Sequence, residues 1–298
     1  MTRTNHPKII VVIGPTASGK SDLGIKLAQK FNGEVVSADS RQVYKGMDIG
    51  TGKISKKEQK LVKHYLLNVA NPKKVFTVSD FKKLGERSIK KILVKNKVPF
   101  IVGGTGFYVD ALVKDLSIPE VPPNKELRKS FDKLSAENLF KMLRKLDPKR
   151  AKTIDSKNKR RLIRALEIIQ ATNKPVPKLV SSIKYQVLWL GLKPKNLENR
   201  IKLRLEKRFK QGMVKEVKNL LNSGISKKRL HDLGLEYRWL GRYLGREISY
   251  KELKDGLLRD IIKYSKRQIT WFKRNKEIYW IKNKKEAGIL IKKFIYSL

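Results

Sequence analysis

Residues 9–24 read IIVVIGPTASGKSDLG. Its first five residues are all apolar and β-branched, which predicts a buried strand. Gly14, Gly19, Lys20 and Ser21 then match the pattern G-x-x-x-x-G-K-[ST], in which a glycine-rich turn directs several backbone N–H groups at one anion. Apolar residues after the turn recur at helical spacing. Strand, turn and helix together predict a phosphate-binding loop.

The chemistry of this loop follows from its residue types. Lys20 adds a positive charge against phosphate oxygens, and the hydroxyl of Ser21 can hold Mg²⁺. The N-terminus of the following helix also favours an anion. The predicted residues that bind a diphosphate or a nucleotide are Gly14, Pro15, Thr16, Ala17, Ser18, Gly19, Lys20 and Ser21. A chance glycine-rich turn is the alternative, and it leaves Lys20 and Ser21 unexplained.

Length and composition narrow the class of protein. The 298 residues, of which 40% are hydrophobic, allow one large domain or two ordinary ones. No apolar run approaches the roughly 20 residues of a membrane span, and the N-terminal MTRTNHPK lacks the apolar region of a signal peptide. The chain has no cysteine, which excludes a disulfide framework and a cysteine-based zinc site. We therefore expect a soluble cytoplasmic protein that binds no membrane.

The charge balance is strongly basic. Lys and Arg number 70 against 27 Asp and Glu, a formal net charge of +43. Such an excess favours a polyanionic partner, because neutralised phosphates release their counterions. Lysine enrichment of solvated faces is the alternative, and stretches such as KISKKEQK fit it. Clustering argues for the first interpretation, since eleven basic residues accompany only two acids between Lys149 and Lys184.

The first 115 residues alternate predicted strands and helices, which favours a parallel sheet covered by helices. Strands are expected at about residues 9–13, 34–37, 65–69 and 98–102. Helices are expected at about residues 19–31, 78–95 and 105–113.

The pattern changes at SIPEVPPN, which holds three prolines and is followed only by helical periods. A buried strand returns at YQVLWLGL, and long helices and a short strand near Ile278 follow. We predict an α/β fold, a doubly wound parallel sheet of the P-loop NTPase type. Its core comprises residues 1–116 and 184–298, with an all-helical insertion domain at residues 117–183.

Residues after the strands are the candidates for chemistry, because ligands of such sheets lie at the carboxyl ends of the strands. Asp39 follows the second strand and could hold Mg²⁺ or act as a general base; a turn aspartate is the alternative. The fourth strand is followed by GGTGFY, where glycines around Thr105 permit close approach of a ligand. No acid follows that strand, so Asp39 is the one obvious carboxylate at a strand end. A nucleotide hydrolase also needs a group that positions water, which disfavours that class.

An arginine row lies further along the chain. In NRIKLRLEKRF, arginines recur every four residues as Arg200, Arg204 and Arg208. Such a row can bind diphosphate oxygens bidentately, although a solvated helix face is the alternative. These features leave three enzymes open: a small-molecule kinase, a nucleic-acid-dependent ATPase, or a transferase with a diphosphate leaving group. A non-catalytic RNA-binding protein with a relic phosphate loop is a fourth possibility.

Several motifs occur together and in a fixed order between Ile9 and Trp280. They are GPTASGKS, ADSRQVYKGMDIGT, HYLLNV, VGGTGFYVDAL, RRLIRALE, EKRFKQGMVKEVKNLL and KRQITWF. In this combination the chain resembles the tRNA dimethylallyltransferases, also called tRNA isopentenyltransferases, of the IPP transferase family.

The resemblance implies a reaction. Members transfer the dimethylallyl group of dimethylallyl diphosphate to N6 of the adenosine 3′-adjacent to the tRNA anticodon, which gives N6-(dimethylallyl)adenosine and diphosphate. The phosphate loop would then hold the diphosphate leaving group. The helical insertion would bind the anticodon stem-loop. Mg²⁺ on Ser21 would be the cofactor, with no organic cofactor, and the expected state is a monomer.

The resemblance also implies roles for single residues. Asp39 matches the general base, Thr105 a residue of the channel where base and diphosphate meet, and Arg208 a diphosphate ligand. Positions that match tRNA contacts are Asp39, Ser40, Arg41, Gln42, Thr105, Arg128, Arg160, Arg161 and Arg164. The chain departs from the family pattern at TGKIS and LGLEYRWL, so the second stretch is assigned no role.

Overall fold

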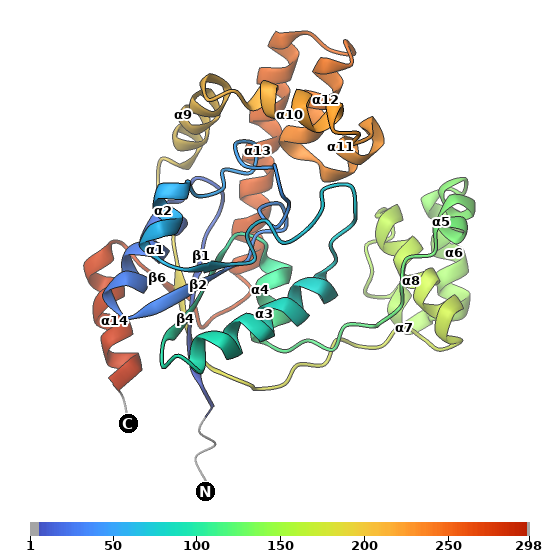
Figure 1. Cartoon of the computed structure of the whole chain (residues 1–298). Coiled ribbons are helices and arrows are strands. Elements are labelled where there is room, and N and C mark those ends of the chain that lie inside the picture. The colour runs from blue at the N-terminus through green and yellow to red at the C-terminus, as the bar shows by residue number, and fades with distance from the viewer. Residues whose placement is uncertain (1–5, 297–298) are drawn as a thin grey trace, which may run out of the picture. The chain divides into compact units, whose positions relative to one another are not determined.

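The chain folds into two compact units. The computed structural model describes residues 6–296, so residues 1–5, on which the expectation of no signal peptide partly rests, lie outside the described part. The core unit comprises Met1–Asp115 and Ser182–Leu298, and the helical unit comprises Leu116–Ser181. Figure 1 shows both units along the chain. Within the described range, no helix is long and apolar enough to cross a membrane.

A six-stranded sheet forms the centre of the core unit. Its strands are β1 (Lys8–Ile13), β2 (Gly33–Ser37), β3 (His64–Tyr65), β4 (Val98–Gly103), β5 (Gln186–Gly191) and β6 (Tyr279–Trp280). They lie in the order β3-β2-β4-β1-β5-β6, and every pair is parallel. The predicted doubly wound parallel sheet is therefore confirmed. Since β1 and β4 lie side by side at its centre, the loops that follow them meet at one edge.

Helices cover both faces of this sheet (Figure 1). They are α1 (Lys20–Lys30), α3 (Val78–Leu93), α4 (Gly106–Val113) and α14 (Lys284–Tyr296). Ile9, Val11 and Ile13 of β1 pack with α3 and α4, whereas Ile10 and Val12 pack with α1 and α14. Burial on both faces explains why the strand is an unbroken apolar run rather than an alternating one.

The third strand is shorter than predicted. The sequence indicated a strand at residues 65–69, but β3 ends at Tyr65. Leu66 and Asn68 have φ angles of 64° and 58°, in the left-handed region, so the chain cannot continue as a strand there. Ala70 regains one parallel bridge, to Tyr44. The turn places the Asn68 side chain among the groups that line the cavity described below.

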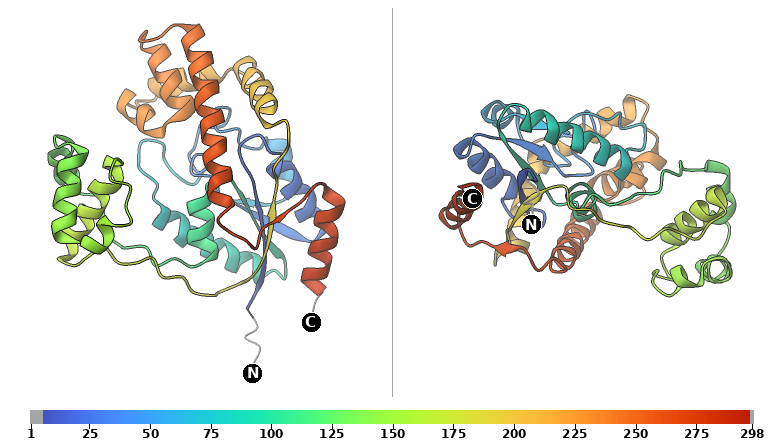
Figure 2. Two further views of the ribbon diagram at one scale, coloured as in Figure 1. Left: turned by 180° about the vertical axis from the view of Figure 1, so that it is seen from behind. Right: turned by 90° about the horizontal axis from the view of Figure 1, so that it is seen from below.

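A second, helical layer of the core unit is formed by the helices that follow β5 along the chain. It contains α9 (Leu197–Lys210), α10 (Met213–Asn222), α11 (Lys227–Leu233), α12 (Leu235–Leu244) and α13 (Tyr250–Phe272). These helices share a core with Val43, Tyr44 and Met47, which follow β2. Figure 2 shows α13, the long orange-red helix, running from this layer back to the sheet. The short α2 (Lys56–Leu61) completes the unit.

The helical unit has its own core. Its helices are α5 (Lys125–Asp132), α6 (Ala136–Leu146), α7 (Pro148–Ala151) and α8 (Lys159–Thr172). Leu162, Ala165, Leu166 and Ile169 lie on one face of α8 and pack with α6. This spacing of three and four residues is the amphipathic pattern that predicted the helix. Asn124, Ser135 and Asn158 accept backbone N–H bonds as N-caps, which sets where the helices begin.

Candidate active site

The phosphate loop adopts an anion-binding shape at the end of β1. Ala17 and Gly19 have φ angles of 62° and 91°, which turn the chain sharply before α1. The backbone N–H groups of residues 19–22 find no acceptor within the described residues. A Cβ on Gly14 would lie 2.8 Å from both the Leu192 carbonyl and the Ser18 hydroxyl, so only glycine fits there. Together these features leave a helix N-terminus open to an anion.

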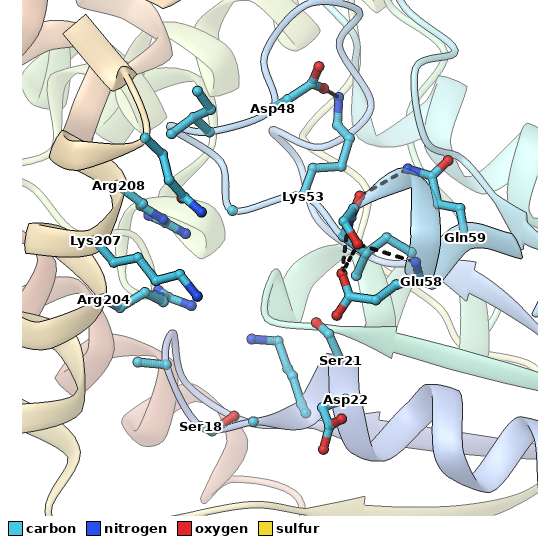
Figure 3. Close-up of a pocket in the computed structure, with 18 of the residues that line it drawn as sticks. Ser18, Ser21, Asp22, Asp48, Lys53, Glu58, Gln59, Arg204, Lys207 and Arg208 are labelled. Atoms are coloured by element: carbon cyan, nitrogen blue, oxygen red, sulfur yellow. Dashed lines mark hydrogen bonds and ion pairs between the residues drawn. The ribbon is translucent and has the colours of Figure 1, made fainter. Parts of the chain in front are cut away.

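A cavity of about 780 Å³ opens above this loop. The loop, the segment after β2 and one face of α9 line it, and seven basic side chains outnumber three acidic ones. In Figure 3, Arg204, Lys207 and Arg208 point from α9 into the cavity, with Ser21 on the opposite side. The size suits a small molecule, and the charge favours an anionic one.

The arginine row of α9 faces the loop. Arg200 Nε donates a 2.8 Å hydrogen bond to the Ala17 carbonyl, and Arg204 donates to the hydroxyl of Thr16. Arg208 is 5% exposed and donates to the Gly50 carbonyl at 3.2 Å and to Glu236 at 3.0 Å. Arg204 and Arg208 therefore do not lie on a solvated helix face, and that alternative is wrong for these two residues.

Crowded cations make the site electrostatically unbalanced. Burial, followed by the nearby Arg204 charge, lowers the pKa of Lys20 from 10.5 to about 8. Burial, followed by the Arg208 charge, lowers the pKa of Arg204 to about 9. Both shifts reflect positive charges held close together and away from water. An anion bound among them would relieve the repulsion and raise both pKa values again.

Asp39 and Thr105 lie together at the ends of β2 and β4. Asp39 Oδ1 accepts the N–H groups of Arg41 at 2.8 Å and Gln42 at 3.3 Å, and its Oδ2 accepts no bond from the described residues. The Thr105 hydroxyl accepts the Ser40 N–H at 3.0 Å and donates to the Ser40 hydroxyl at 3.4 Å. One carboxylate oxygen thus fixes the turn while the other remains available.

This pair does not line the large cavity. Lys20 connects the two places, because the Asp39 charge is among those that act on its pKa. A Cβ on Gly104, the residue before Thr105, would lie 3.3 Å from Lys20 Nζ. The structure therefore forms two groups of predicted site residues. One contains the phosphate loop and Arg208, and the other contains residues 39–42 and Thr105. Lys20 lies between the two groups.

The comparisons with known proteins decide the family. A family model described as "IPP transferase" matches residues 42–275. The chain belongs to the IPP transferase family. It is 38% identical over 289 residues to a tRNA dimethylallyltransferase of Acetivibrio thermocellus, which covers 93% of this chain and 92% of the relative. It is 35% identical to another of Alkaliphilus oremlandii, over 92% of this chain and 90% of that one.

Solved structures agree with this assignment. The tRNA isopentenylpyrophosphate transferase of Bacillus halodurans has a TM-score of 0.71 at 34% identity and covers 97% of this chain and 95% of its own. A eukaryotic dimethylallyltransferase acting on tRNA has a TM-score of 0.80 over 97% of this chain and 79% of its own. Its 24% identity supports the fold alone. The resemblance identified from the motifs is confirmed.

Two further residues, to which no sequence pattern assigns a role, join this IPP transferase site. Gln268 of α13 accepts the Thr16 N–H at 2.8 Å and donates to the Gly104 carbonyl at 2.7 Å, so it connects the loops after β1 and β4. Glu236 pairs with Arg208 at 3.0 Å. Gln268 lies in KRQITWF and Glu236 in the atypical LGLEYRWL. No spacing in one sequence shows which distant loop such residues contact.

The proposed RNA contacts of the helical unit divide into two kinds. Arg128 forms two 2.8 Å bonds to Glu167, which is 1% exposed, and Arg164 bonds the same carboxylate at 2.5 Å. Burial opposes the charge of Glu167, yet these bonds keep its pKa below the usual value. Arg160 and Arg161 are exposed on α8. The first pair also stabilises the unit, whereas the second pair faces solvent.

The residues present fit Mg²⁺ through the hydroxyl of Ser21. Ser21 lines the cavity, and the described residues contain no group of three or more His, Cys, Asp and Glu side chains that could hold a metal. Mg²⁺ commonly keeps several waters and takes its other oxygens from substrate phosphates. A diphosphate in the cavity would supply those oxygens beside the Ser21 hydroxyl.

Replacing Gly52 by Ala should weaken anion binding. Gly52 has a φ of 59°, and a Cβ there would overlap Nη2 of Arg208. We expect the Kd for inorganic diphosphate to rise roughly tenfold, since the Cβ would displace the Arg208 guanidinium at the edge of the cavity. Isothermal titration calorimetry measures it. Gly46→Ala is the matched control, because its φ is 71° but its Cβ would meet only Leu220 at 3.7 Å. Equal effects of the two substitutions would show backbone strain alone.

Proposed function

We propose that this chain transfers the dimethylallyl group of dimethylallyl diphosphate to N6 of the adenosine 3′-adjacent to the tRNA anticodon, giving N6-(dimethylallyl)adenosine and diphosphate. The observation that carries the proposal is the cation-crowded phosphate loop, joined through Lys20 to the carboxylate of Asp39. Relatives named tRNA dimethylallyltransferase, similar over more than nine-tenths of the chain, support it.

The donor side of the reaction needs a site for the leaving group. The bond from C1 of the dimethylallyl group to the diphosphate oxygen breaks, and the diphosphate departs with the electron pair. An allylic carbon tolerates positive character, so stabilisation of the departing anion dominates. Lys20, the N–H groups of residues 19–22, Arg204 and Arg208 would supply it. A diphosphate among these groups would satisfy the unbalanced positive charge of the cavity.

The acceptor side needs a base. The lone pair of an aromatic exocyclic amine is delocalised into the ring, which makes N6 a poor nucleophile. As N6 attacks C1, the proton on N6 passes to a carboxylate, and Asp39 Oδ2 is the oxygen that no other described group occupies. Asp39 Oδ1 keeps its two backbone bonds meanwhile, so the base stays oriented. Thr105 holds Ser40 beside it.

Several parts of the proposal concern partners. The tRNA would contact Asp39, Ser40, Arg41, Gln42, Thr105, Arg128, Arg160, Arg161 and Arg164. Its adenosine must leave the stack, which costs a few kcal/mol and least for a loop nucleotide. Mg²⁺ would bind Ser21 and the diphosphate and neutralise charge on the leaving group. We further propose that the protein is a cytoplasmic monomer that needs no organic cofactor.

A nucleotide hydrolase or kinase is the second candidate, because the loop pattern also binds nucleotides. Against it stands the segment after β4, where Gly104, Thr105 and Gly106 follow without an acid. One comparison separates the two. The protein with Mg²⁺ and dimethylallyl diphosphate should release diphosphate only when tRNA is added, and it should release no phosphate from ATP. Phosphate release from ATP with no diphosphate release would favour the second candidate.

Diphosphate binding should take up a proton at alkaline pH. Lys20 has a pKa of about 8 in the free protein, and a bound anion raises it. Below pH 8 Lys20 is already charged, so the affinity for diphosphate depends little on pH. Above pH 8 the free protein has lost the proton, and affinity should fall by up to about tenfold per pH unit.

Calorimetry at pH 8.5 in buffers of different ionisation enthalpy measures this proton uptake. Lys20→Arg is the control, because its guanidinium titrates at higher pH and should reduce the uptake. Equal proton exchange by the unsubstituted protein and Lys20→Arg would contradict the assigned electrostatics, since the diphosphate and Arg204 exchange protons in both proteins.

A further inference from the structure

Glu216 of α10 is a buried acid outside the proposed machinery, and it is 9% exposed. We propose that Glu216 is a positioning residue that holds the loop of residues 48–52 around Arg208 and thereby sets the affinity of the cavity for diphosphate. The inference rests on the proposed function, since it concerns the same diphosphate site. Glu216 itself does not line the main cavity.

The Glu216 carboxylate accepts four hydrogen bonds. Oε2 accepts the N–H groups of Asp48 at 2.8 Å and Ile49 at 2.6 Å. Oε1 accepts the N–H of Gly50 at 3.0 Å and the hydroxyl of Tyr237 at 2.9 Å. Three successive backbone N–H groups therefore converge on one side chain, and in the described structure it forms no ion pair. A carboxylate held in this way fixes the loop rather than balancing a cation.

The far side of this loop encloses Arg208. The Gly50 carbonyl accepts Arg208 Nη1 at 3.2 Å, and Gly52 lies so close to the guanidinium that no Cβ fits. A Cβ on Gly50 would lie 2.8 Å from the Tyr237 hydroxyl and 3.3 Å from Glu216 Oε1. The loop is thus packed between Glu216 on one side and Arg208 on the other, and glycines permit both approaches.

This arrangement makes Glu216 act through Arg208. Figure 3 shows Arg208 directed into the cavity beside Arg204. Loss of the Glu216 carboxylate would free the N–H groups of residues 48–50, and the loop would no longer present its carbonyl and its glycine to the guanidinium. Arg208 would then be less well placed for an anion. A residue that served only stability would lower diphosphate affinity to the same extent with or without Arg208.

A double-mutant cycle tests this coupling. The probe is inorganic diphosphate, titrated calorimetrically into the full chain and its Glu216→Gln, Arg208→Ala and doubly substituted variants. We expect Glu216→Gln to raise the Kd about tenfold alone, and by less than about twofold once Arg208 is alanine. Glu252→Gln is the matched control: its carboxylate also accepts a backbone N–H, that of Ser249, away from the cavity. It should leave the Kd unchanged.

Equal effects of Glu216→Gln in both backgrounds, or no effect in either, would overturn the inference. If Glu216→Gln does not fold, Tyr237→Phe decides, because it removes one of the four bonds and leaves the backbone contacts in place. It should raise the Kd about threefold, and only when Arg208 is present. Coupling without any transfer to tRNA would contradict the proposed function alone; transfer without coupling would contradict this inference alone.

Discussion

Asp39→Asn should lower the rate of dimethylallyl transfer by about 10²- to 10⁴-fold, the usual contribution of a general base. The amide can still accept the backbone N–H groups of Arg41 and Gln42 through its oxygen, so the turn is retained. It cannot accept the N6 proton at neutral pH. The measurement is the single-turnover rate with saturating dimethylallyl diphosphate, together with the Kd for tRNA.

Binding of tRNA should change by only a few-fold, because the substitution removes one negative charge and no contact donor. Asp155→Asn is the matched control. Asp155 Oδ1 accepts the N–H of Lys157 at 3.1 Å in the same kind of turn, but in the helical unit. It should transfer at the unsubstituted rate. If Asp39→Asn instead lost tRNA binding and kept its single-turnover rate, the base assignment would be wrong.

Lys20→Met should reduce transfer by about 10²- to 10³-fold, as expected when one preorganised donor to a developing anion is lost. Methionine keeps most of the length of the side chain but removes the charge that Gly104 and the Pro15 carbonyl surround. The loss should appear in the affinity for inorganic diphosphate and in turnover. Affinity for tRNA should remain, since the cavity lies around the phosphate loop.

Lys26→Met is the control for this second substitution. Lys26 lies on the same helix, α1, but is half-exposed and pairs with Asp22 at the surface. Its removal should leave diphosphate affinity within about twofold, as surface ion pairs contribute little. Comparable losses for both lysines would indicate that general positive charge, rather than the loop, binds the diphosphate.

The sheet and the phosphate loop could be predicted because their signals are local. The apolar run of β1, the glycines of the loop and the first turn of α1 lie within 16 consecutive residues, 9–24. Within such a stretch, sterics and hydrogen bonding dictate the backbone without help from distant residues. The early end of β3 could not be predicted, because the left-handed conformation of Leu66 leaves no mark on the local sequence.

The contacts that complete the site could not be predicted, because they join distant parts of the chain. Gln268 and Thr16 are 252 positions apart, and Glu216 and Ile49 are 167 apart. Periodicity on α9 indicated an arginine row but not which surface it faced. The family resemblance assigned Arg164 to tRNA contact, whereas the structure also pairs it with the buried Glu167. Topology decides such pairings.

Prenylation of tRNA by this chain can be measured with purified components. The full chain is incubated with Mg²⁺, dimethylallyl diphosphate and unmodified tRNA whose anticodon loop carries adenosines. Mass spectrometry of nuclease fragments then locates any added mass. We expect one dimethylallyl group per tRNA, on N6 of the adenosine 3′-adjacent to the anticodon. An unmodified tRNA, while the same preparation consumes ATP, would contradict this expectation and identify the loop as a nucleotide site.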